Sequence, residues 1–179
     1  MEIAALIRAR VRTVPDWPEP GVMFRDITPL LSDAGTFGNL VDALAQHCAT
    51  HRIDVVAGID ARGFIIGAAL ARAFQRGFVP VRKAGKLPFD TLTEAYSLEY
   101  GNASLQIHAD AIAAGAHVLL VDDLIATGGT MLAAVRLLER LGAAQILPAA
   151  VIDLPDLGGS RALAARGFQP LTLCAFGGH

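Results

Sequence analysis

The chain of 179 residues lacks several features that define common classes of protein. It has no run of Lys or Arg and its formal net charge is −2, so a basic surface for nucleic acid is not expected. Its uninterrupted apolar stretches, such as 64–71, are far shorter than the roughly 18 residues of a membrane span. No basic segment precedes a long apolar core at the start of the chain, so no secretory signal is predicted. We therefore expect a cytoplasmic protein without nucleic-acid or membrane partners.

The chain is also poor in the residues and motifs of several kinds of chemical site. Its two cysteines, Cys48 and Cys174, form no CxxC motif and lie far apart, which favours thiols in a reducing compartment and leaves a disulfide open. Its five histidines form no HExxH motif. His47 and His51 have helical spacing but no acidic partner nearby, so no zinc site is predicted. The phosphate-binding loops GxGxxG and GxxxxGK[ST] are absent as well.

What the sequence does contain is an alternation of apolar strands with amphipathic helices. We expect strands at 55–59, 78–82, 118–121, 145–152 and 170–176, and helices at 1–14, 35–50, 63–75, 130–141 and 160–166. Residues 14–20 are predicted to be irregular, 84–93 turn-rich, 95–100 and 104–107 extended, and 108–112 a helical turn. The alternation predicts an α/β fold with a mostly parallel central sheet flanked by helices. No linker divides the chain, so a single domain is expected over 1–179.

Residues 118–131, VLLVDDLIATGGTM, carry the clearest chemical signal. A buried strand leads to Asp122 and Asp123, and the following loop leads into a helix. Gly128 and Gly129 allow the backbone to approach a ligand, and the amides at the start of the helix form an anion site. Carboxylates repel phosphate, so the ligand must also carry groups that a carboxylate binds. A sugar phosphate satisfies both requirements, because its hydroxyls donate to carboxylates. A purely structural role for two adjacent aspartates here is the weaker interpretation.

The same stretch resembles the phosphoribosyl-pyrophosphate motif of the type I phosphoribosyltransferase family. The resemblance implies that Asp122 and Asp123 bind the ribose hydroxyls. It also implies that the 5′-phosphate is bound by the small residues of the loop, namely Ala126, Thr127, Gly128, Gly129 and Thr130.

Four further segments are similar to the members of this family that use adenine. They are PGVMFRDITPLL (20–31), ARGFIIGAALA (61–71), VRKAGKLP (81–88) and YSLEYG (96–101). The resemblance implies transfer of phosphoribosyl from phosphoribosyl pyrophosphate to adenine, giving AMP and pyrophosphate in purine salvage. It also implies a homodimer and a hood over the base, formed by roughly 1–34. In this hood Phe24 would stack on the purine, and backbone groups around Val22 and Arg25 would bind its edge. A loop-anchoring role for Phe24 and a surface ion pair for Arg25 with Asp26 are the alternatives.

Pyrophosphate needs several positive donors, and two segments supply them. Asp60, Ala61 and Arg62 stand between a strand and a helix, where amides and a guanidinium can bind phosphate. The resemblance implies a cis peptide bond between Asp60 and Ala61. Arg82, Lys83 and Lys86 lie in a loop that could close over the pyrophosphate and exclude water. Solvated surface charges are the alternative for these basic residues, and the resemblance outweighs it for Lys83 and Lys86.

Glu99 is the predicted catalytic residue. A bond that forms at purine N9 requires a proton to be managed elsewhere on the ring, and a carboxylate near N7 can act as the general acid or base. The resemblance gives this role to Glu99 and puts Tyr100 beside it in an active-site loop. An exposed strand glutamate and a packing tyrosine are the alternatives. We expect Mg²⁺ to bind through the pyrophosphate and ribose, with no ligand directly from the protein.

Two other functions remain open from the sequence. The first is transfer to a 6-oxopurine such as xanthine, hypoxanthine or guanine, because base choice depends on backbone geometry in the hood. The second is a regulator that senses purine or phosphoribosyl pyrophosphate without catalysis. Such regulators carry an added DNA-binding domain, for which we expect no room in this chain, and the net charge of −2 argues the same way. For residues 176–179 a frayed end is the default expectation.

Overall fold

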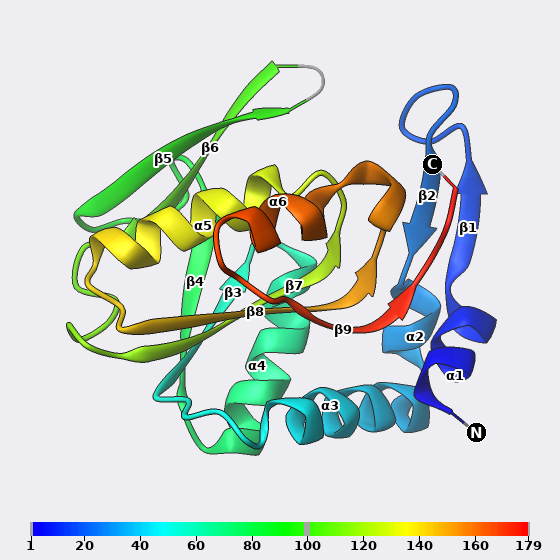
Figure 1. Ribbon diagram of the computed structural model, residues 1–179, viewed down its shortest axis with the longest axis horizontal. Helices are drawn as coiled ribbons and strands as arrows, with labels where there is room; N and C mark the ends of the chain where they lie inside the picture. The colour runs from blue at the N-terminus through cyan, green and yellow to red at the C-terminus, as the bar shows by residue number, and fades with distance from the viewer. Residues whose placement is uncertain (1, 99–100, 179) are drawn as a thin grey trace.

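Seven strands form the central sheet in the order β5-β6-β4-β3-β7-β8-β9 (Figure 1). The computed structural model describes residues 2–98 and 101–178. Five neighbouring strands are parallel, namely β4 (Gly77–Lys83), β3 (Val55–Ile59), β7 (His117–Ile125), β8 (Gln145–Asp153) and β9 (Leu171–Ala175). An antiparallel hairpin of β5 (Thr91–Leu98) and β6 (Gly101–His108) extends the sheet at one edge, where β6 pairs with β4. The predicted mostly parallel α/β fold is confirmed.

Helices cover both faces of the sheet because the strands bury alternate residues on opposite sides. In β7, Leu119 and Val121 join the core beneath α3 (Ala34–Cys48) and α4 (Arg62–Phe74). Val118 and Leu120 join the core beneath α5 (Gly129–Arg140) and α6 (Gly159–Ala165). All four side chains are at most 2% exposed. Burial of each contributes roughly 1.5–3 kcal/mol, so β7 is fixed from both sides.

The segment that ends at Ser32 forms a hood beside the sheet (Figure 1). It consists of α1 (Ile3–Arg10), β1 (Arg12–Pro15), β2 (Met23–Asp26) and α2 (Thr28–Ser32). β1 and β2 pair antiparallel as a two-stranded sheet of their own. The loop between them contains a cis bond at Trp17–Pro18, and its Trp17 ring meets the Phe24 ring edge-on at 4.3 Å between centroids. The helix predicted over 1–14 ends at Arg10, because β1 pairs with β2 from Arg12 onward. β2 and α2 were not predicted, because the prolines around them interrupt every regular apolar pattern.

Three segments differ in detail from the predictions. β7 continues to Ile125 because its pairing with β8 continues as far as Asp153, so Asp122 and Asp123 lie inside the strand and not after it. β5 begins at Thr91, within the stretch predicted to be turn-rich. Residues 108–112 form a single hydrogen-bonded turn, with the amide of Ala111 donating to the carbonyl of His108.

The two cysteines are free and buried in the same core. Burial raises the pKa of the Cys48 thiol to about 11 and also raises the pKa of Cys174. Both are therefore protonated packing residues at neutral pH. Within residues 2–98 and 101–178, no helix has the length and apolar character needed to cross a membrane.

Candidate active site

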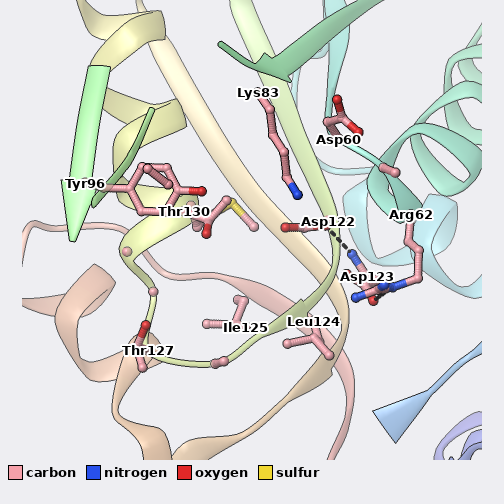
Figure 2. Close-up of a pocket in the computed structure, with 16 residues that line it drawn as sticks. Asp60, Arg62, Lys83, Tyr96, Asp122, Asp123, Leu124, Ile125, Thr127 and Thr130 are labelled. Atoms are coloured by element: carbon pink, nitrogen blue, oxygen red, sulfur yellow. Dashed lines mark hydrogen bonds and ion pairs between the residues drawn. The ribbon is translucent and has the colours of Figure 1, made fainter. Parts of the chain in front are cut away.

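A cavity of about 500 Å³ lies at the carboxyl ends of β3, β4 and β7 (Figure 2). This is where parallel α/β sheets bind ligands. Most of the predicted site residues line it, namely Asp60, Ala61, Arg62, Lys83, Asp122, Asp123, Ala126, Thr127, Gly128, Gly129 and Thr130. Tyr96, Ala103, Leu124, Ile125 and Met131 line it too and were not predicted. Residues from four separate parts of the chain thus converge on one cavity.

The loop 126–128 joins β7 to α5 and lines this cavity. Gly128 caps the helix with φ +82°, a conformation that glycine adopts without strain. The first amides of α5 lack partners within the helix and carry its positive end. Thr127 and Thr130 add hydroxyl donors beside them. The loop therefore has the chemistry of an anion site.

Gly159, at the start of α6, packs against the loop between β7 and α5. This role was not predicted from the sequence. Its amide donates to the carbonyl of Ala126 at 2.9 Å. A Cβ atom on Gly159 would lie 2.4 Å from that carbonyl oxygen and 2.6 Å from the amide nitrogen of Gly128. Only a glycine permits this approach of α6 to the loop. The glycine doublet Gly158-Gly159 ahead of the predicted helix was the available signal.

The two aspartates differ in their surroundings. Asp123 is 4% exposed and accepts a hydrogen bond and ion pair from Nε of Arg62. The Asp122 side chain is half-buried, and its Oδ1 accepts from the backbone amide of Asp123 at 2.9 Å. Burial and the neighbouring Asp123 charge raise the pKa of Asp122 well above its ordinary value of 3.8. The charged form of Asp122 would thus be stabilised by a hydroxyl donor or a cation that a ligand brings.

The start of α4 lies against the end of β7 because residue 63 is glycine. A Cβ there would lie 2.7 Å from the carbonyl oxygen of Val121. The peptide bond between Asp60 and Ala61, just before this helix, is cis, as predicted. The Oδ2 atom of Asp60 accepts from Nε of Arg82 at 3.2 Å. These contacts bring Asp60 and Arg62 to the cavity beside Asp123.

Of the three basic residues predicted to share a loop, only Lys86 lies in one, because Arg82 and Lys83 end β4 and pair with β6. Lys83 lines the cavity, and Figure 2 shows its amino group pointing toward Asp122. Arg82 is paired with Asp60 and also donates to the carbonyl of Lys86 at 3.2 Å. Neither Arg82 nor Lys86 is among the residues that line the cavity. The Lys86 side chain is exposed. Arg82 therefore holds the loop that carries Lys86.

A second cavity, of about 410 Å³, adjoins the first beneath the hood. It is lined by hood residues 20–25, which include the predicted Val22, Phe24 and Arg25, and by Leu154, Leu157 and Gly178. Arg62, Leu124 and Ala126 line both cavities. The guanidinium of Arg62 lies over the Phe24 ring at 5.5 Å from its centroid. An aromatic-lined pocket is thus continuous with the anion site.

The surface ion pair considered for Arg25 does not occur. Arg25 is 8% exposed, and its side chain donates to Oγ1 of Thr13 at 2.5 Å and to the carbonyl of Gly177 at 3.0 Å. Asp26 pairs instead with Arg12 at 3.5 Å. The contact with Gly177 also corrects the expectation of a frayed end, because the described residues 176–178 are held by hydrogen bonds.

Glu99 and Tyr100 lie outside the described residues. The hairpin that they connect reaches the cavity through Tyr96 and Ala103. Glu94 on β5 accepts hydrogen bonds from Arg136 at 2.5 Å and from Arg140 at 3.3 Å, both on α5. These bonds fix the base of the hairpin to the helix that begins at the anion site. Within the described part of the chain, no group of three or more His, Cys, Asp and Glu side chains is arranged to hold a metal ion.

Comparisons with known proteins agree on one family. The family described as phosphoribosyl transferase domain matches residues 31–167. An adenine phosphoribosyltransferase of Cupriavidus taiwanensis is 57% identical over 178 residues, which cover 99% of this chain and 94% of that protein. The crystal structure of adenine phosphoribosyltransferase from Thermoanaerobacter pseudethanolicus superimposes with a TM-score of 0.93 at 43% identity, covering 97% of this chain and 99% of that one. The Saccharomyces cerevisiae enzyme, solved with an imino-altritol bisphosphate and adenine, gives 0.87 at 38% identity, with 96% and 98% covered.

Proposed function

The chain belongs to the adenine phosphoribosyltransferases, and from this premise we propose how its residues transfer phosphoribosyl from phosphoribosyl pyrophosphate to adenine. The products are AMP and pyrophosphate, and the activity serves purine salvage. One observation best supports separate binding sites for the sugar phosphate and the base. The anion cavity and the hood cavity share Arg62, Leu124 and Ala126, so a sugar bound in the first can meet a base bound in the second.

The phosphoribosyl group occupies the loop and the aspartates in this proposal. Amides of Ala126 to Thr130 and the two threonine hydroxyls bind the 5′-phosphate. Asp122 and Asp123 accept hydrogen bonds from the ribose hydroxyls. As the bond to pyrophosphate breaks, the sugar becomes cationic, and the negative field of the two carboxylates stabilises that charge. The raised pKa of Asp122 supports this role, because a carboxylate that is partly desolvated and lies beside a second carboxylate is stabilised by an approaching positive charge.

Pyrophosphate lies toward Arg62 and Lys83 in the proposal, with the backbone of Asp60 and Ala61 supplying amide contacts. Lys86 joins when its loop closes, and Arg82, at the end of β4, adds its charge beside that loop. A Mg²⁺ ion held mainly by the substrate fits the protein's donors, because Asp123 is already paired with Arg62 and Asp60 with Arg82. When bound, the ion would neutralise charge on the pyrophosphate as it leaves.

Adenine lies in the hood cavity in this proposal, stacked on Phe24 and bound at its edge by backbone groups of Val22 and Arg25. Glu99 receives or returns the purine proton, and Tyr100 lies beside it. Support for these last two roles comes from the sequence alone. The buried, free cysteines support a reducing cytoplasmic location. Family membership supports a homodimer and one functional unit over 1–179.

The first experiment incubates purified protein with phosphoribosyl pyrophosphate, Mg²⁺ and one base at a time: adenine, hypoxanthine, guanine, xanthine or orotate. Chromatography then measures the nucleoside monophosphate. We expect AMP from adenine and no product from the other bases. Product from a 6-oxopurine would keep the sugar site and overturn the assignment of the hood. Binding of phosphoribosyl pyrophosphate without product from any base would favour the regulator.

A further inference from the structure

The segment Phe176–Gly178, which we call the C-terminal strap, connects the hood to the main sheet. It leaves β9 and runs beside β1 and β2 (Figure 1). The amide of Phe176 donates to the carbonyl of Asp153 at 3.0 Å, which continues the contact between β9 and β8. Gly178 is one of the residues that line the hood cavity. The strap therefore reaches from the central sheet to the wall of the proposed base pocket.

Arg25 holds the hood side of the strap. Its guanidinium donates to Thr13 on β1 and to the carbonyl of Gly177, and it lies over the Phe176 ring at 4.9 Å from the centroid. With only 8% of the residue exposed, these contacts are largely shielded from water, which strengthens them. One side chain thus links both hood strands to the strap.

Asp156 holds the opposite side. It lies in the short helix η1 (Pro155–Leu157), and its Oδ2 accepts from the amide of Gly178 at 2.9 Å. η1 leads directly to Gly159, which supports the phosphate loop. The strap is therefore held between the hood and the segment beneath the anion site.

We propose that the C-terminal strap holds the hood over the base pocket, with Arg25 and Asp156 as positioning residues for the base. The inference rests on the proposed function in one respect only, the identity of the base as adenine. β1 and β2 have no ladder contact with the seven-stranded sheet, so their position depends on side-chain and strap contacts. α1 and α2 are packed in the core through Ile7, Ile27 and Leu30, so loss of the strap would loosen β1 and β2 and weaken base binding while the sugar site keeps its geometry.

The test compares Asp156→Ala with Asp156→Asn. Asp156 is exposed, so both variants should fold. Alanine removes the acceptor of the Gly178 amide, whereas asparagine keeps an oxygen there. We expect Asp156→Ala to raise the KM for adenine about fivefold, the effect of one lost hydrogen bond, with the KM for phosphoribosyl pyrophosphate within about twofold of wild type. Asp156→Asn should restore the KM for adenine. Arg76→Met is the matched control, because it removes a hydrogen bond from Arg76 to the carbonyl of Ile53, far from the hood.

Hydrogen exchange supplies a readout that does not need activity. The amides of β1 and β2 should exchange faster in Asp156→Ala than in wild type, with no change in β3 or β7. Unchanged exchange in the hood would overturn the inference, and so would an equal rise in both KM values. If wild type makes no AMP, the proposed function fails, but the exchange comparison still decides whether the strap holds the hood.

Discussion

The guanidinium of Arg62 donates to the carboxylate of Asp123, so the first turn of α4 is tied to the end of β7. The pair fixes an arginine where the two cavities meet. It also leaves the remaining guanidinium donors available to a ligand, since Nε makes the contact with Asp123.

Arg62→Met should lower kcat/KM for phosphoribosyl pyrophosphate about 30-fold. Removal of one partner from a buried charge pair costs roughly 2–5 kcal/mol, and the low end applies because the Arg62 side chain is 41% exposed. The kcat/KM of Arg62→Lys should lie between those of wild type and Arg62→Met, because lysine keeps the charge but loses the planar guanidinium. Steady-state kinetics check this. Arg52→Met, which breaks an exposed pair with Asp54, is the control. Equal losses in the Arg62 and Arg52 variants would contradict the prediction.

Asp122→Asn should make the protein more stable at neutral pH while it weakens sugar binding. The folded state raises the pKa of Asp122, so the proton is held more tightly in the folded than in the unfolded chain. That contribution to stability is complete below the ordinary value of 3.8 and is lost as pH rises through the raised pKa. The variant's advantage should therefore grow as pH rises from about 4 and reach the order of 1 kcal/mol.

Urea denaturation of both proteins from acid to neutral pH measures this trend. Asp42→Asn, on the exposed side of α3, is the control. A stability difference that shrinks with rising pH would refute the assigned direction of the pKa shift.

Gly159→Ala should weaken binding of phosphoribosyl pyrophosphate about 100-fold, because the new Cβ would overlap the backbone of Ala126 and Gly128. Backbone cannot yield as a flexible side chain does, so the loop must move, and a displaced loop loses several hydrogen bonds of about 1 kcal/mol each. Gly38→Ala is the matched control. Its Cβ meets nothing within 4 Å inside α3, and it should stabilise the protein by roughly 0.5–1 kcal/mol. Calorimetric titration and thermal unfolding separate the two effects.

Glu94→Gln should lower kcat about fivefold with little change in the KM for either substrate. The variant removes the charge that holds β5 to Arg136 and Arg140, and each such contact is worth about 1 kcal/mol when partly buried. The hairpin leads to Glu99. A hairpin that is held less firmly to α5 should therefore lower kcat more than it weakens substrate binding. Glu139→Gln, which breaks an exposed pair with Arg166, is the control. A larger effect on KM than on kcat would argue against this link.

The main sheet could be predicted because its strands and helices carry their own patterns. The apolar run from Val118 to Val121 and the helical spacing after Thr130 are local signals of burial. The hood could not be predicted in the same way. Pro15, Pro18 and Pro20 break the alternation around β1 and β2, and their pairing depends on contacts with the rest of the chain.

The site residues also differ in how far they could be predicted from local sequence. Asp122 through Thr130 could be identified because a single short segment carries the motif. Gly159 could not, since its contact with Ala126 joins residues that are far apart in the sequence. The same reason hid the bond from Arg25 to Gly177, which only the folded chain brings together. Local sequence patterns predict helices and strands, whereas contacts between distant segments are seen only in the structure.

The separate two-stranded sheet of the hood has a consequence for how this protein could change over evolutionary time. β1 and β2 share no ladder with the seven-stranded sheet, so substitutions there can reshape the base pocket without disturbing the core. β7 has no such freedom, because the strand that carries Asp122 and Asp123 also joins both cores. Changes in base preference should therefore arise from substitutions in the hood, whether in natural descent or in mutant libraries. The residues that bind the sugar phosphate should stay the same.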